Sequence, residues 1–282
     1  MLRMLASTET PPITTASMDK HIPRRRFGQH FLTDQAVIAE IVAAIHPLAE
    51  DAMVEIGPGL EALTAPLAAL LRHLEVIEID RDIAARLRGA YPPDRVSVHE
   101  GDVLEFDFSA LPAKLRVVGN LPYNISTPLL FHLAHYADRI RDMHFMLQKE
   151  VVERMVARPG GADYGRLSVT LQYRFDMELL FGVGPGAFSP PPQVDSAVVR
   201  MVPRPRAQLT AASLPALEQV VRRAFAQRRK TLRNSLAGLL AAEDYAALGI
   251  APGLRAQNLA VADFVAIGNY LAEKQRLPPG FD

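Results

Sequence analysis

The sequence predicts an α/β protein with a doubly wound sheet and a small C-terminal helical domain. Short apolar segments alternate with stretches of helical periodicity from residue 33 to residue 157. This alternation favours right-handed crossovers and a parallel sheet with helices on both faces. After residue 206 the chain is rich in Ala and Leu at helical spacing, which indicates helices without a sheet.

Apolar periodicity and capping residues give the order of the expected elements. They are a helix from Thr33 to Ile45, a strand at 53–56, a helix at 63–71, a strand at 76–79, a helix capped by Asp80, strands at 95–99 and 115–119, a helix at 129–137, a strand at 143–147 and a helix at 149–157. Thr127 and Pro128 are expected at the N-cap and first position of the helix at 129–137. Ligands lie at the carboxyl ends of the strands in such sheets, so functional residues are expected there.

The pattern changes after Ser168. Strand-like runs are expected from Ser168 to Pro203, with a Pro-rich interruption at 188–192. The segment 203–206 alternates Pro with Arg and is interpreted as a linker. We therefore divide the chain into a tail at residues 1–19, a sheet domain at 20–205 and a helical domain at 206–282.

The first 19 residues are rich in Ser, Thr and Pro and lack periodicity. They contain no apolar run of the roughly 7 residues that a secretory signal needs. Glu9 and Asp19 argue against a mitochondrial transit peptide. We interpret the segment as a disordered tail, or as upstream translation from a start that lies at Met18.

The composition excludes several kinds of site. The 282 residues include no cysteine, so disulfides, iron–sulfur clusters and thiolate metal sites are excluded, and no metal site is expected. No apolar run approaches the roughly 18 residues of a membrane span. The absence of disulfides fits a reducing cytoplasm, where we expect the protein to act. The 31 basic and 31 acidic side chains cancel, so net charge alone says nothing about a polyanionic partner.

The turn Gly57-Pro58-Gly59 stands between a strand and a helix, where glycines let the backbone approach a ligand closely. With Ala62 it fits the dinucleotide pattern, and Glu78 ends the next strand 19 residues after Gly59, where an acid binds ribose hydroxyls. This half of the site is compatible with NAD, with FAD and with S-adenosylmethionine, because all three share adenosine.

Two further strand ends separate these ligands. Gly101-Asp102 follows the third strand, where the Asp102 carboxylate can accept a hydrogen bond from an adenine amine. The tetrapeptide Asn120-Leu121-Pro122-Tyr123 ends the fourth strand, and a nicotinamide enzyme has no evident need for it.

That tetrapeptide suits methyl transfer to an exocyclic adenine amine, whose lone pair is delocalised into the ring. The Asn120 side-chain oxygen and the Leu121 carbonyl can both accept hydrogen bonds from the amine, which favours a pyramidal nitrogen aimed at a sulfonium methyl. Pro122 makes the turn rigid, and Tyr123 can stack on the base. Phe188, just before three prolines, is a candidate for the other side of the base.

In these motifs and their order, the sequence resembles the bacterial ribosomal RNA small-subunit (16S) adenine N6,N6-dimethyltransferases. This family is related to erythromycin-resistance rRNA methylases and to mitochondrial transcription factor B. The resemblance runs from about Arg24 to Leu271 and rests on nine separated segments: 26–32, 55–60, 78–80, 101–102, 119–126, 146–150, 164–168, 190–196 and 227–230.

The resemblance implies a Rossmann-like class I methyltransferase sheet, S-adenosylmethionine as cofactor, and cofactor contacts at His30, Leu32, Gly57, Glu78, Asp102 and Asn120. The strand–helix turn adds Gly59 to this set. Position 30 is often Asn in the family and is His here. A cofactor contact through the backbone would survive this change, whereas a contact through the side chain would differ. The family converts two adjacent adenosines in a hairpin near the 3′ end of 16S rRNA to N6,N6-dimethyladenosine. The implied substrate is an immature small subunit, and we expect the enzyme to act as a monomer.

Two clusters of basic residues are candidates for RNA contacts. One is Lys20, Arg24, Arg25 and Arg26; the other is Arg222, Arg223, Arg228, Arg229, Lys230 and Arg233, a run without an acid. On a continuous helix Arg222, Arg229 and Arg233 approach one face, a spacing suited to tracking phosphates. The helical domain is therefore predicted to bind RNA by shape and backbone contacts rather than by reading bases.

Three alternatives keep part of this pattern. A nicotinamide-dependent oxidoreductase explains the glycines and Glu78 but leaves Asp102 and the tetrapeptide without a role. A methyltransferase acting on DNA adenine or a protein amide would use a similar Asn-Pro-Tyr motif, but the basic helical domain disfavours it. A non-catalytic assembly or transcription factor would retain the fold, and the intact acceptor motif argues against it.

Overall fold

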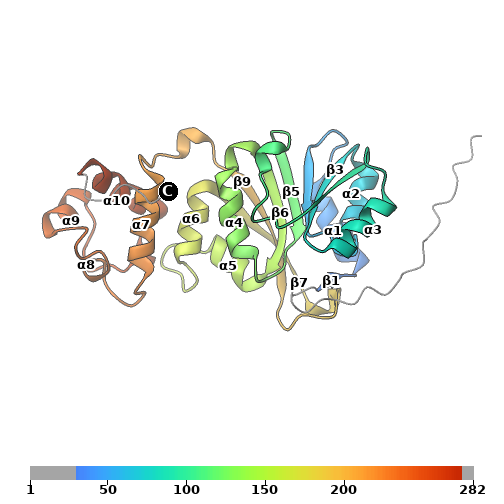
Figure 1. The fold of residues 1–282 in the computed structure, drawn as a ribbon. Helices are drawn as coiled ribbons and strands as arrows, with labels where there is room; N and C mark the ends of the chain where they lie inside the picture. Colours follow the sequence, from blue (N-terminus) through green and yellow to red (C-terminus); the bar gives the residue numbers. More distant parts are fainter. Residues whose placement is uncertain (1–29, 275–282) are drawn as a thin grey trace, which may run out of the picture.

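The computed structural model describes residues 30–274, which form a mixed seven-stranded sheet with helices on both faces and a helical part stacked outside the helices of one face (Figure 1). The strand order is β4-β3-β2-β5-β6-β9-β7. Within the described residues, no helix is both long and apolar enough to cross a lipid bilayer.

Five strands are parallel, as the strand–helix alternation predicted. They are β2 (Met53–Ile56), β3 (Leu74–Glu78), β4 (Val96–Glu100), β5 (Leu115–Asn120) and β6 (Ile140–Gln148). The remaining two, β7 (Phe175–Val183) and β9 (Ser196–Pro203), run antiparallel: β9 lies between β6 and β7. The strand order reverses between β2 and β5, where ligands bind in this class of sheet.

The two faces of the sheet bury separate hydrophobic cores. One core receives α1 (Gln35–Ile45), α2 (Thr64–Leu70) and α3 (Arg81–Ala90); the other receives α4 (Ser126–His135), α5 (Lys149–Val156) and α6 (Arg166–Arg174). In β2, Met53 faces the first core, and Val54 and Ile56 belong to the second. Local sequence defines the helix starts: the Asp80 carboxylate caps α3, and Asp34 caps α1.

The prediction for the start of α4 was wrong. The helix begins at Ser126, and Ile125 rather than Thr127 is the N-cap residue. The Ser126 hydroxyl donates a hydrogen bond of 3.0 Å to the Pro122 carbonyl, so the turn that follows β5 continues directly into the helix. Pro128 therefore lies inside the first turn, where its missing amide hydrogen has no intrahelical partner to lose.

A second prediction was wrong at Arg166–Arg174, where strand-like runs were expected from Ser168 and the chain forms α6. The alternation of Leu167, Val169, Leu171 and Tyr173 suggested a half-buried strand. It arises because α6 is buried on two sides. Leu167 and Leu171 pack in the sheet core, while Val169 and Tyr173 pack in the core of the helical part.

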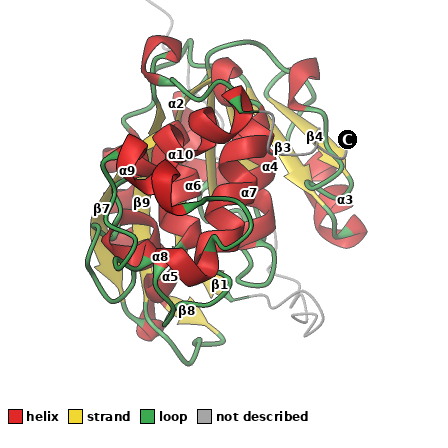
Figure 2. Ribbon diagram, turned by 90° about the vertical axis from the view of Figure 1, so that its left-hand side faces the viewer, coloured by secondary structure: helices red, strands yellow, loops and turns green. Residues whose placement is uncertain are grey.

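The helical part contains α7 (Leu214–Phe225), α8 (Leu232–Ser235), α9 (Ala242–Leu248) and α10 (Val261–Glu273), seen in front of the sheet in Figure 2. The helices α7 and α10 pack closely at Gly268, where an added Cβ would lie 3.3 Å from the Leu217 backbone. This core includes Tyr164 and two residues of α6, so the helices do not bury their apolar faces alone. The division at residue 205 falls between β9 and α7 and stays a prediction.

A buried ion-pair network holds the amino-terminal ends of the central strands. The Arg116 side chain on β5 is almost fully buried and donates to Asp142 on β6 at 2.9 Å, to Asp51 at 2.7 Å and to the last carbonyls of α1. Burial raises the pKa of Asp51, but the Leu48 amide and Arg116 outweigh it, so the net pKa is lowered. A lowered pKa in the folded state means that this stabilisation is lost as the pH falls through the acidic range.

Replacing Arg116 with Met should lower the free energy of unfolding by about 3–5 kcal/mol, because Asp51 and Asp142 would keep their burial without a cation. Urea unfolding at neutral pH measures the change. Arg141→Met is the matched control: Arg141 pairs with the same Asp51 at 2.8 Å but is half exposed, so its loss should cost less than about 1 kcal/mol. Equal losses in the two variants would contradict a stabilising role for the buried network.

Candidate active site

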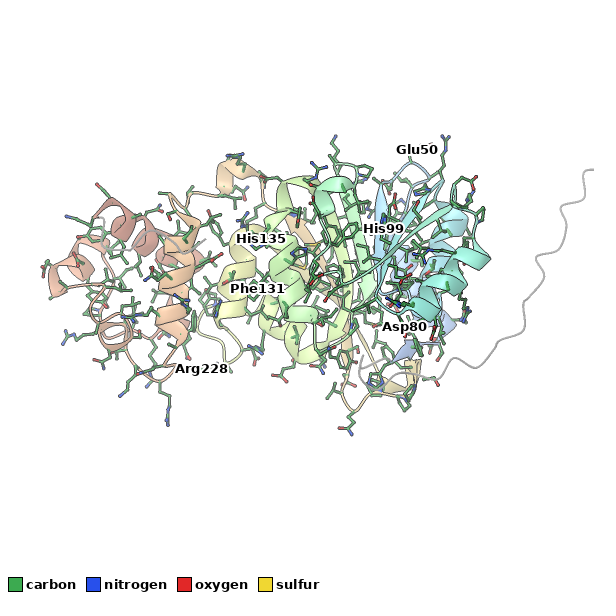
Figure 3. All side chains as sticks on the ribbon, in the orientation of Figure 1. Glu50, Asp80, His99, Phe131, His135 and Arg228 are labelled. Atoms are coloured by element: carbon green, nitrogen blue, oxygen red, sulfur yellow. The ribbon has the colours of Figure 1, made fainter. Side chains whose placement is uncertain are left out.

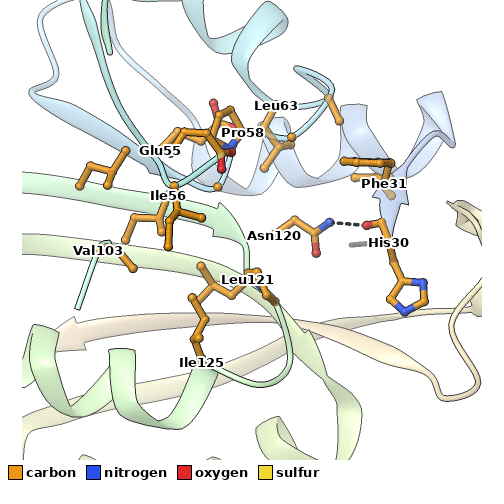
Figure 4. Close-up of a pocket in the computed structure, with 18 of the residues that line it drawn as sticks. His30, Phe31, Glu55, Ile56, Pro58, Leu63, Val103, Asn120, Leu121 and Ile125 are labelled. Atoms are coloured by element: carbon orange, nitrogen blue, oxygen red, sulfur yellow. Dashed lines mark hydrogen bonds between the residues drawn. The ribbon is translucent and has the colours of Figure 1, made fainter. Parts of the chain in front are cut away.

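A cavity of about 350 Å³ opens at the carboxyl ends of β2, β3, β4 and β5, where the strand order reverses (Figure 4). The structure brings ten of the residues selected from the sequence to its wall: His30, Leu32, Gly57, Gly59, Glu78, Asp102, Asn120, Leu121, Pro122 and Tyr123. These residues come from five separate segments of the chain. Their convergence follows from the parallel strands, whose carboxyl ends share one edge of the sheet.

The turn after β2 has the backbone geometry that its glycines predict. Gly57 and Gly59 adopt φ angles of 67° and 55°, in the left-handed region that side chains disfavour. The Gly57 amide donates to the Ile77 carbonyl of β3 at 3.0 Å, which ties the turn to the neighbouring strand. A Cβ at Gly59 would lie 3.1 Å from the Phe31 ring. The turn therefore offers bare backbone to the cavity.

Two carboxylates stand at consecutive strand ends. Glu78, 6% exposed, accepts a hydrogen bond of 2.8 Å from the Asp80 amide, and burial raises its pKa. Asp102 accepts one of 2.9 Å from the Leu104 amide, which orients its side chain in the turn after β4. Each carboxylate has further acceptor capacity for a ligand, because an ionised carboxyl group offers about four lone-pair sites.

Asn120 is oriented by a contact across the cavity mouth. Its Nδ2 donates to the His30 carbonyl at 3.2 Å (Figure 4). Because a carbonyl oxygen only accepts hydrogen bonds, this contact fixes which end of the amide points to His30. The Oδ1 acceptor is turned the other way.

The acceptor motif is held in place by its neighbours. The Leu121 amide donates to the Met146 carbonyl of β6 at 3.1 Å, and the Pro122 carbonyl accepts from the Ile125 amide at 3.2 Å. The Tyr123 hydroxyl shares a hydrogen bond of 2.9 Å with Ser196. One face of its ring stacks on His30 with centroids 5.8 Å apart and planes inclined by 28°. The motif is therefore fixed before any substrate arrives.

Phe188 does not line the cavity. It is 5% exposed in the two-stranded sheet of β1 (Phe31–Leu32) and β8 (Phe188–Ser189), where it lies opposite Leu32. Its side chain packs in the core shared with α1 and α2. The stacking role on the substrate base stays a prediction, and the structure gives Phe188 a packing role beside the site.

The residue most easily missed from the sequence is Glu55. It belongs to the motif at 55–60 and had no predicted role there, yet it lines the cavity at 1% exposure. Its Oε2 accepts a hydrogen bond of 2.7 Å from the Thr64 hydroxyl, and burial raises its pKa to about 8. The signal in the sequence was a carboxylate inside the apolar strand Met53–Ile56.

The charges of the cavity wall fit a cationic cofactor. Three acidic residues line it, Glu55, Glu78 and Asp102, and neither Lys nor Arg is among its lining residues in the described chain. The pyrophosphate of a dinucleotide would face these carboxylates without a cation. S-adenosylmethionine has one carboxylate but also a sulfonium, an ammonium group, ribose hydroxyls and an adenine amine, and these four groups are suited to acceptors.

The basic residues of the helical part do not form one helix, so the single-face prediction was wrong. The helix α7 ends at Phe225, the chain turns at 226–230, and α8 begins at Leu232. All six side chains, Arg222, Arg223, Arg228, Arg229, Lys230 and Arg233, are nevertheless exposed around this one bend (Figure 3 labels Arg228). The cluster at Lys20, Arg24, Arg25 and Arg26 and the tail at 1–19 lie outside the described residues.

The ribosomal RNA adenine dimethylase family model matches residues 20–273. The chain belongs to this family. The match confirms the resemblance based on the sequence motifs, and with it the class of enzyme, an S-adenosylmethionine-dependent rRNA adenine dimethyltransferase.

Relatives and solved structures agree with this assignment. The chain is 62% identical over 258 residues to the ribosomal RNA small subunit methyltransferase A of Chromobacterium violaceum, covering 91% of this chain and 98% of that one. It is 61% identical to the ribosomal RNA small subunit methyltransferase A of Thiobacillus denitrificans, and the match covers 90% of this chain and 100% of that one. The fold matches a dimethyladenosine transferase from Plasmodium falciparum at a TM-score of 0.74 and 24% identity, over 88% and 98% of the two chains. It also matches the fold of the 23S rRNA methyltransferase ErmE, with a TM-score of 0.68 and 26% sequence identity. This match covers 86% of this chain and 99% of that one.

Gly119→Ala should lower the melting temperature and weaken S-adenosylmethionine binding. An added Cβ would lie 2.5 Å from the Ile56 carbonyl oxygen, which forces β5 and Asn120 away from β2 at a cost of about 1–3 kcal/mol. Thermal unfolding and equilibrium dialysis with labelled cofactor measure both effects. Gly89→Ala on α3 is the control, since Gly89 does not line the cavity and nothing lies within 4 Å of its added Cβ. A Gly119→Ala variant that melts and binds like Gly89→Ala would refute the tight approach of the two strands.

Proposed function

We propose that this protein transfers methyl groups from S-adenosylmethionine to N6 of two adjacent adenosines in a hairpin near the 3′ end of 16S rRNA, forming N6,N6-dimethyladenosine during small-subunit biogenesis. Family membership supports the reaction class. The observation that carries the proposal is the acceptor motif 120–123 on the wall of the acidic cavity. A nicotinamide-dependent oxidoreductase would leave this motif without a role.

The cavity wall offers partners for the ribose and the adenine of the cofactor. Glu78 at the end of β3 is assigned the ribose hydroxyls, and Asp102 the adenine amine. The bare backbone at Gly57 and Gly59 lets the ligand approach the turn closely. When bound, S-adenosylmethionine supplies an electrophilic methyl group. Further cofactor contacts are assigned to the segment 30–32, through His30 and Leu32 on the same wall.

The acceptor motif binds and aims the substrate amine. Asn120 Oδ1 and the Leu121 carbonyl accept hydrogen bonds from N6, which favours a pyramidal nitrogen with its lone pair available. Tyr123 offers a ring for stacking the base. Because the Asn120 amide is already held by His30, little reorganisation is needed when the base enters. The residues contribute positioning and electrostatics, and we assign no general base.

The exposed basic bend at 222–233 is assigned to the RNA backbone. Six cations around one turn suit phosphate contacts rather than base readout. We propose that the substrate is the rRNA within an immature small subunit, and that the enzyme acts as a monomer in the cytoplasm. Relatives are named for the small-subunit rRNA, which supports this choice of RNA over a DNA or protein acceptor.

The proposal is tested with S-adenosylmethionine carrying a labelled methyl group and immature small subunits that lack the modification. After digestion to nucleosides, label in N6,N6-dimethyladenosine is the expected result. Label in another nucleoside would show that the enzyme methylates a different target from the one proposed. No transfer despite measured cofactor binding would favour a non-catalytic assembly factor with the same fold.

Asn120→Ala should reduce methyl transfer by at least about a hundredfold, because it removes one of two acceptors that orient N6. Single-turnover rates on immature subunits give the change. RNA affinity, measured on the same preparation by filter binding, should stay within about twofold, since Asn120 lies in the cavity and not on the basic bend. Turnover at the wild-type rate would contradict the assigned role.

Replacing Arg228, Arg229 and Lys230 together with Gln should weaken RNA binding. The log–log salt slope should fall by roughly one unit for each phosphate that the variant no longer neutralises. The matched control replaces Arg72, Lys114 and Arg141 with Gln; these three are exposed at the amino-terminal ends of β3, β5 and β6. The control should keep the wild-type slope. If the two triple variants change the slope equally, the bend is not the RNA-binding surface.

A further inference from the structure

Glu55 is a buried carboxylate in the cofactor cavity for which the reaction described above has no use. It lies on β2 beside Pro58, on the wall of the cavity (Figure 4). Its one side-chain hydrogen-bond partner in the described chain is Thr64 on α2. A carboxylate in such surroundings is costly, since a single hydroxyl replaces the several water molecules that would otherwise solvate it.

The groups that face Glu55 add negative rather than positive charge. Glu78 on β3 and Glu61 in the turn before α2 both raise its pKa, after burial itself, to about 8. Glu61 is in turn paired with Arg86 of α3 at 3.0 Å and accepts from the Tyr91 hydroxyl at 3.0 Å, so Arg86 is already neutralised. The adjacent residue on β5 is Val118, which has no charge. At neutral pH the carboxyl group is therefore mostly protonated in the free enzyme.

The cofactor and its product differ in charge at one atom. S-adenosylmethionine has a sulfonium, and the product S-adenosylhomocysteine has a neutral thioether; their amino, carboxyl, ribose and adenine groups are the same. A positive charge placed in a buried, acid-lined cavity stabilises a nearby carboxylate, because the local dielectric is low. The thioether provides no such stabilisation.

We propose that Glu55 discriminates between cofactor and product by charge: it releases a proton when the sulfonium form binds and recovers one when the thioether product replaces it. The inference rests on the proposed function for its choice of ligand. It gives the enzyme a means to favour loaded cofactor over spent product, which matters because dimethylating two adenosines needs four exchanges.

The protons balance over one cycle. On loading, Glu55 gives its proton to solvent. In the transfer, the N6 lone pair forms the new N–C bond, the electron pair of the broken S–C bond stays on sulfur, and N6 loses its proton to solvent. Glu55, without a cation beside it, then takes a proton from solvent. The release and uptake by Glu55 cancel, so one proton per methyl leaves the amine.

The test is calorimetric titration of the full chain with each ligand, without RNA, in buffers of different protonation enthalpy. At pH 7 the wild type should release close to one more proton with S-adenosylmethionine than with S-adenosylhomocysteine, and at pH 9.5 the difference should vanish. Since the pKa of Glu55 is about 8, affinity for S-adenosylmethionine relative to the product should rise about tenfold between pH 7 and pH 9.

Glu55→Gln should abolish both the difference in proton release and the pH dependence of the affinity ratio. Thr64→Val keeps the carboxyl group but removes the hydrogen bond that favours its ionised form, so the midpoint of the pH dependence should move to higher pH. This second variant tests the inference even where Glu55→Gln fails to fold.

The contrary outcomes separate the inference from the proposed function. Equal proton release with the two ligands in the wild type overturns the inference and leaves the proposed function intact. An unchanged midpoint in Thr64→Val assigns the proton to another group and also overturns it. If neither ligand binds, the proposed function fails together with the inference.

Discussion

The backbones of β2 and β5 approach so closely at their carboxyl ends that residue 119 has room for a hydrogen atom and nothing larger. An added Cβ there would lie 2.5 Å from the Ile56 carbonyl oxygen. This contact sits where the strand order reverses, and it sets the spacing between the glycine turn after β2 and Asn120 after β5. The turn after β2 and the segment 120–123 after β5 are neighbours in space because β2 and β5 are paired parallel strands whose carboxyl ends meet at one edge of the sheet.

The opposite ends of the same strands are held differently. There Arg116 joins β5, β6 and the end of α1 through buried ion pairs and helix carbonyls. Its charge is paired with the carboxylates of Asp51 and Asp142. At the carboxyl ends, by contrast, hydrogen-bond capacity remains at Glu78, Asp102 and Asn120. One sheet thus has a structural end and a reactive end, as its topology requires.

Much of this could be predicted from the sequence because local signals and tertiary packing agreed. The strand Met53–Ile56 and the Asp80 cap were found at the expected residues. The predictions from local sequence were wrong where tertiary burial, rather than the local hydrophobic pattern, decided the structure. The helix α6 is buried on two sides and so carries strand-like alternation.

The basic run at 222–233 contains no glycine or proline to mark its break, and the helix α7 ends there without a sequence signal. Phe188 was selected for its neighbours in sequence, whereas its contacts are decided by pairing with the distant strand β1. Glu55 could be recognised only as part of a motif, because its chemistry depends on burial.

Although the net charge of the chain is zero, acidic and basic side chains gather at two separate places on the molecule. The cavity wall has three acidic residues and no Lys or Arg among its lining residues in the described part, while the bend at 222–233 exposes six cations. An acid-lined cavity repels phosphate and attracts a sulfonium. A basic bend does the reverse, so under the proposed function the RNA backbone stays outside while one uncharged base enters the cavity. The base has no charge of its own, because the phosphates are attached to the ribose. The base is also the part of the nucleotide that would receive the methyl group. Under that proposal, the charge distribution selects the reacting group as well as the two ligands.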